Sequence, residues 1–223
     1  MRMDFSRRAT EPELLDQGVS EAEALRSLSD IRLVNRWFGG RRSLRQAVGP
    51  YLSGGGCLLD VGCGSADLPA FILGSHPPGV TAVGIDLKPL HVRQAPAGVL
   101  RVVGDVRALP FAPRSFDVVT ASLFLHHFDA PEVADVLRAL FCLARRALVI
   151  NDLHRARVPF LFAQAVFPWI FQSAVSVNDG LVSIRRAFRP EELLAAFREA
   201  GIARVSVHRR FPYRLVAVAE ATT

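Results

Sequence analysis

The 223-residue sequence predicts an α/β fold with a doubly wound, mostly parallel sheet of seven strands, one of them antiparallel. Short apolar runs alternate with segments of helical periodicity, as in a chain of β–α units. The runs are apolar at nearly every position, which is typical of parallel strands covered by helices on both faces. Two further runs near the end of the chain are only a few residues apart, and so short a connection requires an antiparallel pair, so the sheet is expected to end in one antiparallel strand.

The first part of the chain is expected to form a helical cap. Apolar side chains recur near a 3.6-residue spacing over residues 11–48, and the pair Gly39-Gly40 interrupts the pattern. A second short helix is expected to stop before Pro50, and the following "SGGG" is typical of a flexible linker. The predicted units are residues 1–52 for the cap and 53–223 for the α/β domain.

The predicted strands follow one another as a doubly wound sheet requires. Helical segments are expected after the first, second and fourth strands, and Pro131 suits the first turn of the helix after the fourth strand. A final helix is expected to begin near Pro190 and to end at Gly201. The seven expected strands lie near residues 57–61, 80–86, 98–105, 115–123, 146–152, 203–210 and 213–220.

Composition limits the possible classes of function. The formal charge is +6, but Lys88 is the only lysine and the arginines are scattered, without the basic stripe that is typical of nucleic-acid binding. Cys57, Cys63 and Cys142 form an odd set without metal-type spacing, which favours a reducing compartment. The charged residues 1–15 do not resemble a secretory signal. We therefore expect a cytoplasmic protein that binds neither nucleic acid nor a metal ion.

The most informative stretch is "CLLDVGCGSADLP" at residues 57–69. A strand ends in Asp60 and runs into Gly62 and Gly64, which let a ligand approach the backbone closely. A nicotinamide cofactor fits poorly, because the last glycine of the G-x-G-x-x-G pattern is replaced by Asp67 and because Asp60 would repel a pyrophosphate. A ligand with a positive charge suits this carboxylate better.

Carboxylates also end the next two predicted strands. Asp86 lies about 20 residues beyond the glycine loop, where a carboxylate accepts hydrogen bonds from both hydroxyls of a ribose. Asp105 ends the third strand and suits an adenine amino group. Because the carboxyl ends of parallel strands line one crevice, these groups and Asp60 are expected to share a site, which is costly unless a ligand supplies donors and positive charge. S-adenosylmethionine supplies an ammonium, a sulfonium, a ribose diol and an adenine amine.

In their order and spacing, the motifs "LLDVGCGSADLP", "GIDLKP", "GDVRALPF" and "SFDVVTASLFLHHF" resemble those of class I S-adenosylmethionine-dependent methyltransferases, which have a Rossmann-like fold. The resemblance covers about residues 57–152, and the rest of the chain up to residue 220 is also consistent with the family. The resemblance implies S-adenosylmethionine as cofactor and S-adenosylhomocysteine as product. The sequence departs from the family pattern at Ala66, where the family usually has a third glycine. The cofactor-binding residues it implies are Asp60, Gly62, Cys63, Gly64, Asp86, Leu87, Asp105, Val106 and Ser122.

The catalytic group is less well determined by the sequence. Methyl transfer depends on in-line positioning and exclusion of water, and a phenol or carbon acceptor also needs a base, for which histidine is well suited. Candidates follow the fourth and fifth strands: His126, His127, Asp152 and His154. The alternative for His126 and His127 is a purely structural role, and the alternative for His154 is a solvated position on a loop. Asp152 could orient a base or a hydroxyl.

Residues 155–188 are expected to form a lid over the methyl group. The segment is almost wholly apolar from Val158 to Val177, but Pro168 and two glutamines disfavour a membrane span. The alternative to a lid is a helix packed into the core. Peripheral membrane contact that gives access to a lipidic acceptor is a further alternative. The residues expected to contact the acceptor are Phe167, Trp169 and Phe171.

Two longer patterns, "ELLD…ALRSLSDIRLVNRWFGG" and "VINDLHR…SIRRAFRPEEL", are more loosely similar to bacterial methyltransferases found beside type III polyketide synthases and to quinone-pathway methyltransferases. We therefore predict a monomeric or homodimeric enzyme of secondary metabolism that methylates a hydroxyl of a small phenolic, polyketide or quinone-type acceptor. C-methylation is the alternative. An RNA or protein methyltransferase is disfavoured because no N/D-P-P-Y-type motif follows the fourth strand, and a member that uses the cofactor non-catalytically is a further possibility.

Overall fold

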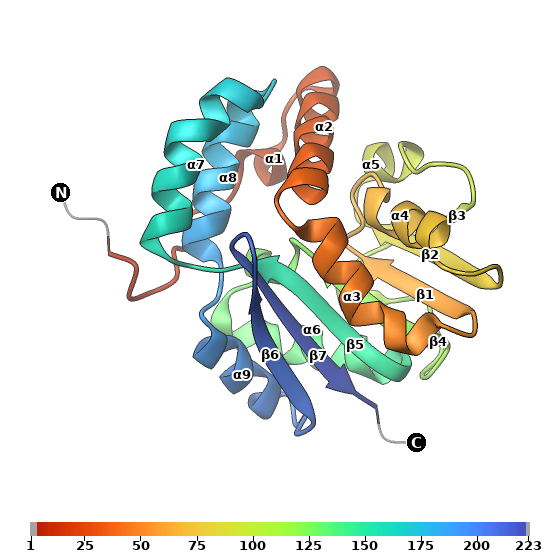
Figure 1. Cartoon of the computed structure of the whole chain (residues 1–223). Helices are drawn as coiled ribbons and strands as arrows, with labels where there is room; N and C mark the ends of the chain where they lie inside the picture. Colours follow the sequence, from red (N-terminus) through yellow and green to blue (C-terminus); the bar gives the residue numbers. More distant parts are fainter. Residues whose placement is uncertain (1–3, 222–223) are drawn as a thin grey trace.

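The computed structural model describes residues 4–221, which contain a seven-stranded sheet flanked by helices (Figure 1). The strands are β1 (Gly56–Val61), β2 (Val80–Asp86), β3 (Val99–Val103), β4 (Phe116–Ser122), β5 (Ala144–Leu153), β6 (Val205–Arg210) and β7 (Arg214–Glu220). Their order across the sheet is β3-β2-β1-β4-β5-β7-β6. The first five strands pair in parallel, and β7 is antiparallel to both of its neighbours. The predicted fold class is confirmed.

The strand order places a crevice in the middle of the sheet. From β1 the chain winds outward through β2 and β3, and it then returns to the other side of β1 to continue with β4 and β5. In open α/β sheets, ligands bind outside the carboxyl ends of the strands where the winding reverses. Here that point lies between β1 and β4, and the register sets Asp60 of β1 beside Thr120 of β4 and Gly84 of β2.

The antiparallel strand lies inside the sheet and not at its edge. The hairpin of β6 and β7 inserts β7 against β5, with Ile150 opposite Ala217, and leaves β6 as the edge strand. The burial patterns agree with this placement, because β7 is mostly buried whereas β6 alternates between half-buried and exposed residues before ending in exposed ones.

Helices cover both faces of the sheet. On one face, apolar side chains of α3 (Gly40–Leu52) and α4 (Asp67–Ser75) pack against β1, β4, β5 and β7. On the other face, α6 (Ala130–Leu143) and α9 (Pro190–Glu199) pack in the larger core cluster. Short helical segments follow β2, β3 and β4: α5 (Pro89–Arg93), η1 (Val106–Ala108) and η2 (Leu125–His127).

The second N-terminal helix differs from the prediction in its end point. The sequence predicts a stop before Pro50, but α3 runs on to Leu52, with Pro50 inside it. The apolar residues Leu44, Val48 and Leu52 are fully buried on the sheet, and this packing carries the helix past the proline. Tertiary contacts therefore override the local preference.

The remaining helices gather at one end of the sheet (Figure 1). These are α1 (Leu14–Gln17), α2 (Glu21–Trp37), α7 (Arg157–Ile170) and α8 (Ala174–Arg186). The segment expected to be a lid thus forms a pair of helices, of which α8 also contacts α1 and α2. None of the helices within residues 4–221 is both long and apolar enough to span a membrane. Residues 1–3 and 222–223 of the predicted units lie outside the described residues.

Candidate active site

A cavity of about 410 Å³ lies at the carboxyl ends of β1, β2 and β4. Its floor comes from the loops that follow these strands, and α1, α2 and α8 line the opposite side. All nine residues that the resemblance implies for cofactor binding line this cavity. We call the side formed by residues 60–106 the cofactor half, and the side formed by α1, α2, α8 and the residues after β4 the acceptor half.

The glycine loop after β1 has the open backbone that its sequence predicts. Gly62 and Gly64 have φ angles of +66° and +53°, in the left-handed region that favours glycine. A Cβ atom at Gly62 would lie 2.1 Å from a ring carbon of Phe124, so a side chain there would displace this ring. Ala66 also adopts a left-handed conformation, with φ of +54°. This explains why glycine is usual at that position, and alanine accepts the conformation at a cost of about 1 kcal/mol.

Asp60 is a buried carboxylate at the end of β1. It accepts a hydrogen bond of 2.6 Å from Thr120 Oγ1. Burial raises the pKa of Asp60 to about 7, and the nearby charges of Asp67 and Asp86 act in the same direction, against the effect of the Thr120 hydrogen bond. Such a carboxylate favours a cationic ligand, because a positive charge offsets the cost of ionising it in this environment.

Asp86, at the end of β2, is held by several donors. Its oxygens accept hydrogen bonds from the backbone nitrogens of Gly64, at 2.8 Å, and Lys88, at 2.9 Å, and His91 Nδ1 lies 3.4 Å away. Burial opposes ionisation, but the contacts with His91 and Lys88 outweigh it and lower the pKa of Asp86. Asp105 is more exposed and accepts a hydrogen bond from its own turn. Both residues line the cavity, and Asp86 does so as a carboxylate.

The acceptor half is lined by single faces of two helices. From α2, Leu28, Ile31 and Val34 line the cavity at the spacing of one helical face. From α8, the lining residues again recur every three or four positions, from Ser176 to Ile184. The rings of Phe124, Phe167 and Phe171 complete this largely apolar wall.

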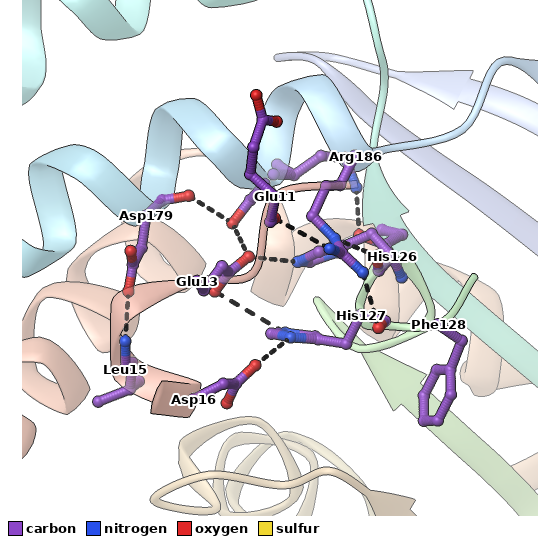
Figure 2. A network of polar contacts seen from close by, with 12 residues as sticks. Glu11, Glu13, Leu15, Asp16, His126, His127, Phe128, Asp179 and Arg186 are labelled. Atoms are coloured by element: carbon purple, nitrogen blue, oxygen red, sulfur yellow. Dashed lines mark hydrogen bonds and ion pairs between the residues drawn. The ribbon is translucent and has the colours of Figure 1, made fainter. Parts of the chain in front are cut away.

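Two stacked histidines, His126 and His127, interrupt the apolar wall (Figure 2). His126 is buried, with Nδ1 2.7 Å from Asp152 Oδ1 and Nε2 3.2 Å from Glu13 Oε1. Burial opposes a charge on this ring, but the carboxylates of Asp152 and Glu13 outweigh burial and raise the pKa of His126 to about 10. The His126 imidazolium in turn lowers the pKa of Asp152 to about 2, against the effect of burial. His126 is therefore a charged, fully paired group at neutral pH.

His127 is the more accessible of the pair, with 27% of its side chain exposed. Its Nδ1 lies 2.8 Å from Asp16 Oδ2, and its Nε2 lies 3.9 Å from Glu13 Oε2. The ring lines the cavity, as do Glu13 and Asp16 (Figure 2). The ligand atoms of Glu13, His126 and His127 lie within 4.8 Å of one another, which would also suit a metal ion, but here carboxylates pair with both nitrogens of His126.

Comparison with known proteins agrees with this geometry. Residues 58–146 match the family model described as "Methyltransferase domain". The chain is a class I S-adenosylmethionine-dependent methyltransferase. S-adenosylmethionine is its cofactor, as the sequence predicts. The matched segment contains the glycine loop, the carboxylates at the ends of β1 and β2, and Asp105 in the loop after β3.

Two curated relatives of the methyltransferase are described as demethylmenaquinone methyltransferases. The protein from a Roseiflexus species is 28% identical in an alignment of 186 positions that covers 74% of this chain and 73% of the relative. The protein from Roseiflexus castenholzii is 27% identical over 183 residues, with the same coverage.

Solved structures share the fold of the methyltransferase. An S-adenosylmethionine-dependent methyltransferase from Aquifex aeolicus superposes with a TM-score of 0.65 at 15% identity, over 91% of this chain and 99% of that one. Human N-acetylserotonin methyltransferase superposes with a TM-score of 0.69 at 16% identity, over 92% of this chain and 57% of that one.

Three predicted site residues of the methyltransferase lie outside the cavity lining. His154 is half-buried beside Phe162 and Tyr213 in a separate small hollow. Asp152 is fully buried and reaches the cavity only through His126. Trp169 is 87% exposed, because α7 buries Phe160, Ala163 and Phe167 on one face and turns Trp169 to the opposite one.

Sequence reasoning missed two residues that the methyltransferase brings to its histidines. Glu13 and Asp16 come from the N-terminal segment, more than 100 residues away from His126 and His127. The only signal in the sequence is the pair of carboxylates in "ELLD", and it has no recognisable spacing relative to the histidines. Their proximity follows from the tertiary fold alone.

Proposed function

We propose that the enzyme methylates a hydroxyl group of a small, flat, hydrophobic acceptor of phenolic, polyketide or quinone type. The observation that carries this proposal is the position of His127, a partly accessible histidine in a largely apolar wall that faces the cofactor half. Apolar walls with a few polar groups are typical of sites for small molecules. The curated relatives are described as demethylmenaquinone methyltransferases, which supports a quinone-type acceptor.

The residues of the cofactor half fit S-adenosylmethionine chemically. In this proposal Asp60 binds its ammonium group, Asp86 its ribose hydroxyls and Asp105 its adenine amine, with Leu87 and Val106 beside the ring. Ser122 Oγ is buried and lacks a hydrogen-bond partner among the described residues, so it is free to bind a ligand. When bound, this cofactor supplies an electrophilic methyl group on a positively charged sulfur.

His127 is the proposed general base. The acceptor hydroxyl would transfer its proton to His127 Nε2 as its oxygen bonds to the methyl carbon, and the bond from that carbon to the cofactor sulfur would break to release S-adenosylhomocysteine. His127 Nδ1 is engaged by Asp16, whereas Nε2 lies 3.9 Å from Glu13, beyond hydrogen-bond distance. His126 is the less suitable base, because both of its ring nitrogens already face carboxylates, at 2.7 Å from Asp152 and 3.2 Å from Glu13. The apolar side chains of α2 and the rings of Phe167 and Phe171 orient the acceptor and exclude water.

C-methylation is the second candidate reaction. The same deprotonation converts a phenol or quinol into a phenolate whose ring carbons are also nucleophilic. A carbon close to the methyl group would then attack in place of the oxygen, so the orientation of the acceptor in the cavity decides between the two products.

The test is to incubate the purified enzyme and its cofactor with a panel of phenols, naphthols and hydroquinones. S-adenosylhomocysteine is measured by mass spectrometry, and the position of the new methyl group by NMR. His127→Gln is expected to lower turnover about 100-fold, because a general base contributes on that order, while the cofactor affinity stays within about twofold. His154→Gln, outside the cavity, is the matched control. Turnover of no panel member, or wild-type turnover in His127→Gln, would contradict the proposal.

A further inference from the structure

Residues 4–17, which we call the N-terminal strap, lead to the acceptor half of the cavity, which Glu13, Leu15 and Asp16 line. The strap contains only the four-residue helix α1, and side chains from other elements hold its backbone. The guanidinium of Arg155 donates to the carbonyls of Phe5 and Ser6, and that of Arg186 donates to the carbonyls of Thr10 and Glu11. The position of the strap is therefore set by contacts with the rest of the enzyme.

The end of the strap is fixed most tightly at α8. Both oxygens of Asp179 accept hydrogen bonds from backbone nitrogens of the strap, at 2.8 Å from Leu14 and 2.9 Å from Leu15. One turn later on the same helix, Ser183 Oγ donates to the carboxylate of Glu13. These contacts aim the carboxylates of Glu13 and Asp16 at the two histidines.

Asp16 links the two halves of the cavity. One of its oxygens lies 3.1 Å from Lys88 Nζ, and the other lies 2.8 Å from His127 Nδ1. Lys88 also donates to the carbonyl of Leu15, and its backbone nitrogen donates to Asp86. A continuous series of contacts thus runs from the cofactor half through Lys88 and Asp16 to His127. Burial opposes ionisation of Asp16, but the hydrogen bond from His127 and the charge of Lys88 hold its pKa well below the usual range.

The two nitrogens of His127 face two different carboxylates. A neutral imidazole has one N–H donor and one acceptor nitrogen, and its hydrogen bonds decide which is which. Asp16 is within hydrogen-bond distance of Nδ1, whereas Glu13 is 3.9 Å from Nε2. Asp16 therefore favours the ring with the proton on Nδ1, and the lone pair of Nε2 is left for the acceptor. Without Asp16, Glu13 would favour the opposite tautomer, which has no lone pair on Nε2.

We propose that Asp16 is a positioning residue that sets the tautomer and orientation of His127 when the strap lies in place. The proposal rests on the proposed role of His127 as the base. The strap then has two roles, because it lines the acceptor half of the cavity and also positions His127, the base that activates the acceptor hydroxyl. Because Lys88 holds the same carboxylate, the geometry of the base is tied to the loop that follows Asp86.

The test compares Asp16→Ala with Glu11→Ala. Glu11 is a matched control, since it is also a strap carboxylate but pairs with Arg185 and does not contact the histidines. Asp16→Ala is expected to lower kcat about tenfold, less than the loss seen for buried carboxylate–histidine pairs, because the Asp16 side chain is 45% exposed. In Asp16→Ala the acceptor KM is expected to stay within about threefold of the wild-type value. Asp16→Glu is expected to restore part of kcat, and Lys88→Met is expected to lower kcat by about threefold.

A second readout is the tautomer of His127, measured from ring ¹⁵N shifts in alkaline buffer and assigned by its absence in His127→Gln. Asp16→Ala is expected to move the proton from Nδ1 to Nε2, and Glu11→Ala is not. An unchanged tautomer in Asp16→Ala overturns the inference, even if kcat falls, because the strap then acts only as a cover. A changed tautomer with unchanged turnover supports the role of Asp16 and contradicts the proposed role of His127. The two proposals thus fail separately.

Discussion

The two halves of the cavity are built in different ways. The cofactor half uses residues from one continuous stretch, Asp60 to Val106, and each carboxylate follows the end of a neighbouring strand. The acceptor half combines residues from Glu13 to Ile184, which come from the strap, three helices and the loop after β4. Backbone topology therefore organises the first half, and side-chain packing between distant segments organises the second.

This difference predicts that each half can be disrupted without the other. Contacts between Gly64, Asp86 and Lys88 stay within the cofactor half, and those between Glu13, His126 and Asp152 stay within the acceptor half. Asp16 and Lys88 form a direct contact between the two. Variants on either side of this contact show how independent the halves are.

The largest expected effect is that of Asp86→Ala on cofactor affinity. The variant removes the proposed acceptor of both ribose hydroxyls, and hydrogen bonds to a charged group contribute about 1.5–3 kcal/mol each, so the cofactor Kd is expected to rise at least about 100-fold. Titration calorimetry measures this effect, and Asp135→Ala on the exposed face of α6 is the control. Unchanged affinity would contradict the ribose assignment.

Phe167→Ala should affect the acceptor half alone. Loss of a ring that lines the cavity is expected to raise the acceptor KM about tenfold with an unchanged cofactor Kd, and to lower the free energy of unfolding by about 3 kcal/mol. Trp169→Ala on the same helix is the control and should change neither constant, because its ring is exposed. Equal losses of acceptor and cofactor binding in Phe167→Ala would mean that α7 acts as core and does not shape the acceptor site.

The pH dependence of cofactor binding tests Asp60. Its pKa of about 7 means that the carboxyl is mostly protonated at pH 6, so binding of a cationic cofactor must first release a proton. Affinity is therefore expected to rise about fivefold between pH 6 and pH 7. Asp86 does not contribute in this range, because its pKa is lowered. Calorimetry at several pH values measures the trend, which should disappear in Asp60→Asn; a trend that persists there would assign it to another group.

An effect of similar size is expected for Ser122→Ala. The hydroxyl of Ser122 is buried at the cavity without a partner among the described residues, so a bound ligand is expected to use it, at about 1 kcal/mol. This corresponds to a roughly fivefold loss of affinity for cofactor or acceptor. Ser115→Ala provides the comparison, since its hydroxyl is likewise unpartnered among these residues but lies away from the cavity. Equal behaviour of the two variants would exclude a ligand contact.

The sequence by itself determined the sheet, the cofactor and the three carboxylates. Parallel strands bring their carboxyl ends to one edge of the sheet, so motifs that follow successive strands lie close together there, independently of how their side chains pack. The same reasoning located His126 and His127 after β4. The position of β7 inside the sheet could not be read in this way, because a short hairpin fits either at the edge or one strand further in.

Only the tertiary structure decided how the histidines differ and what reaches them. Both nitrogens of His126 are paired, and Nδ1 of His127 is paired, because Glu13, Asp16 and Asp152 approach from segments with no local relation to the histidine pair. Likewise, Phe167 and Trp169 belong to one apolar run, and the packing of α7 against α8 turns the first inward and the second outward. A local pattern records which residues share a strand end or a helix face, whereas contacts between distant segments depend on how the complete chain packs.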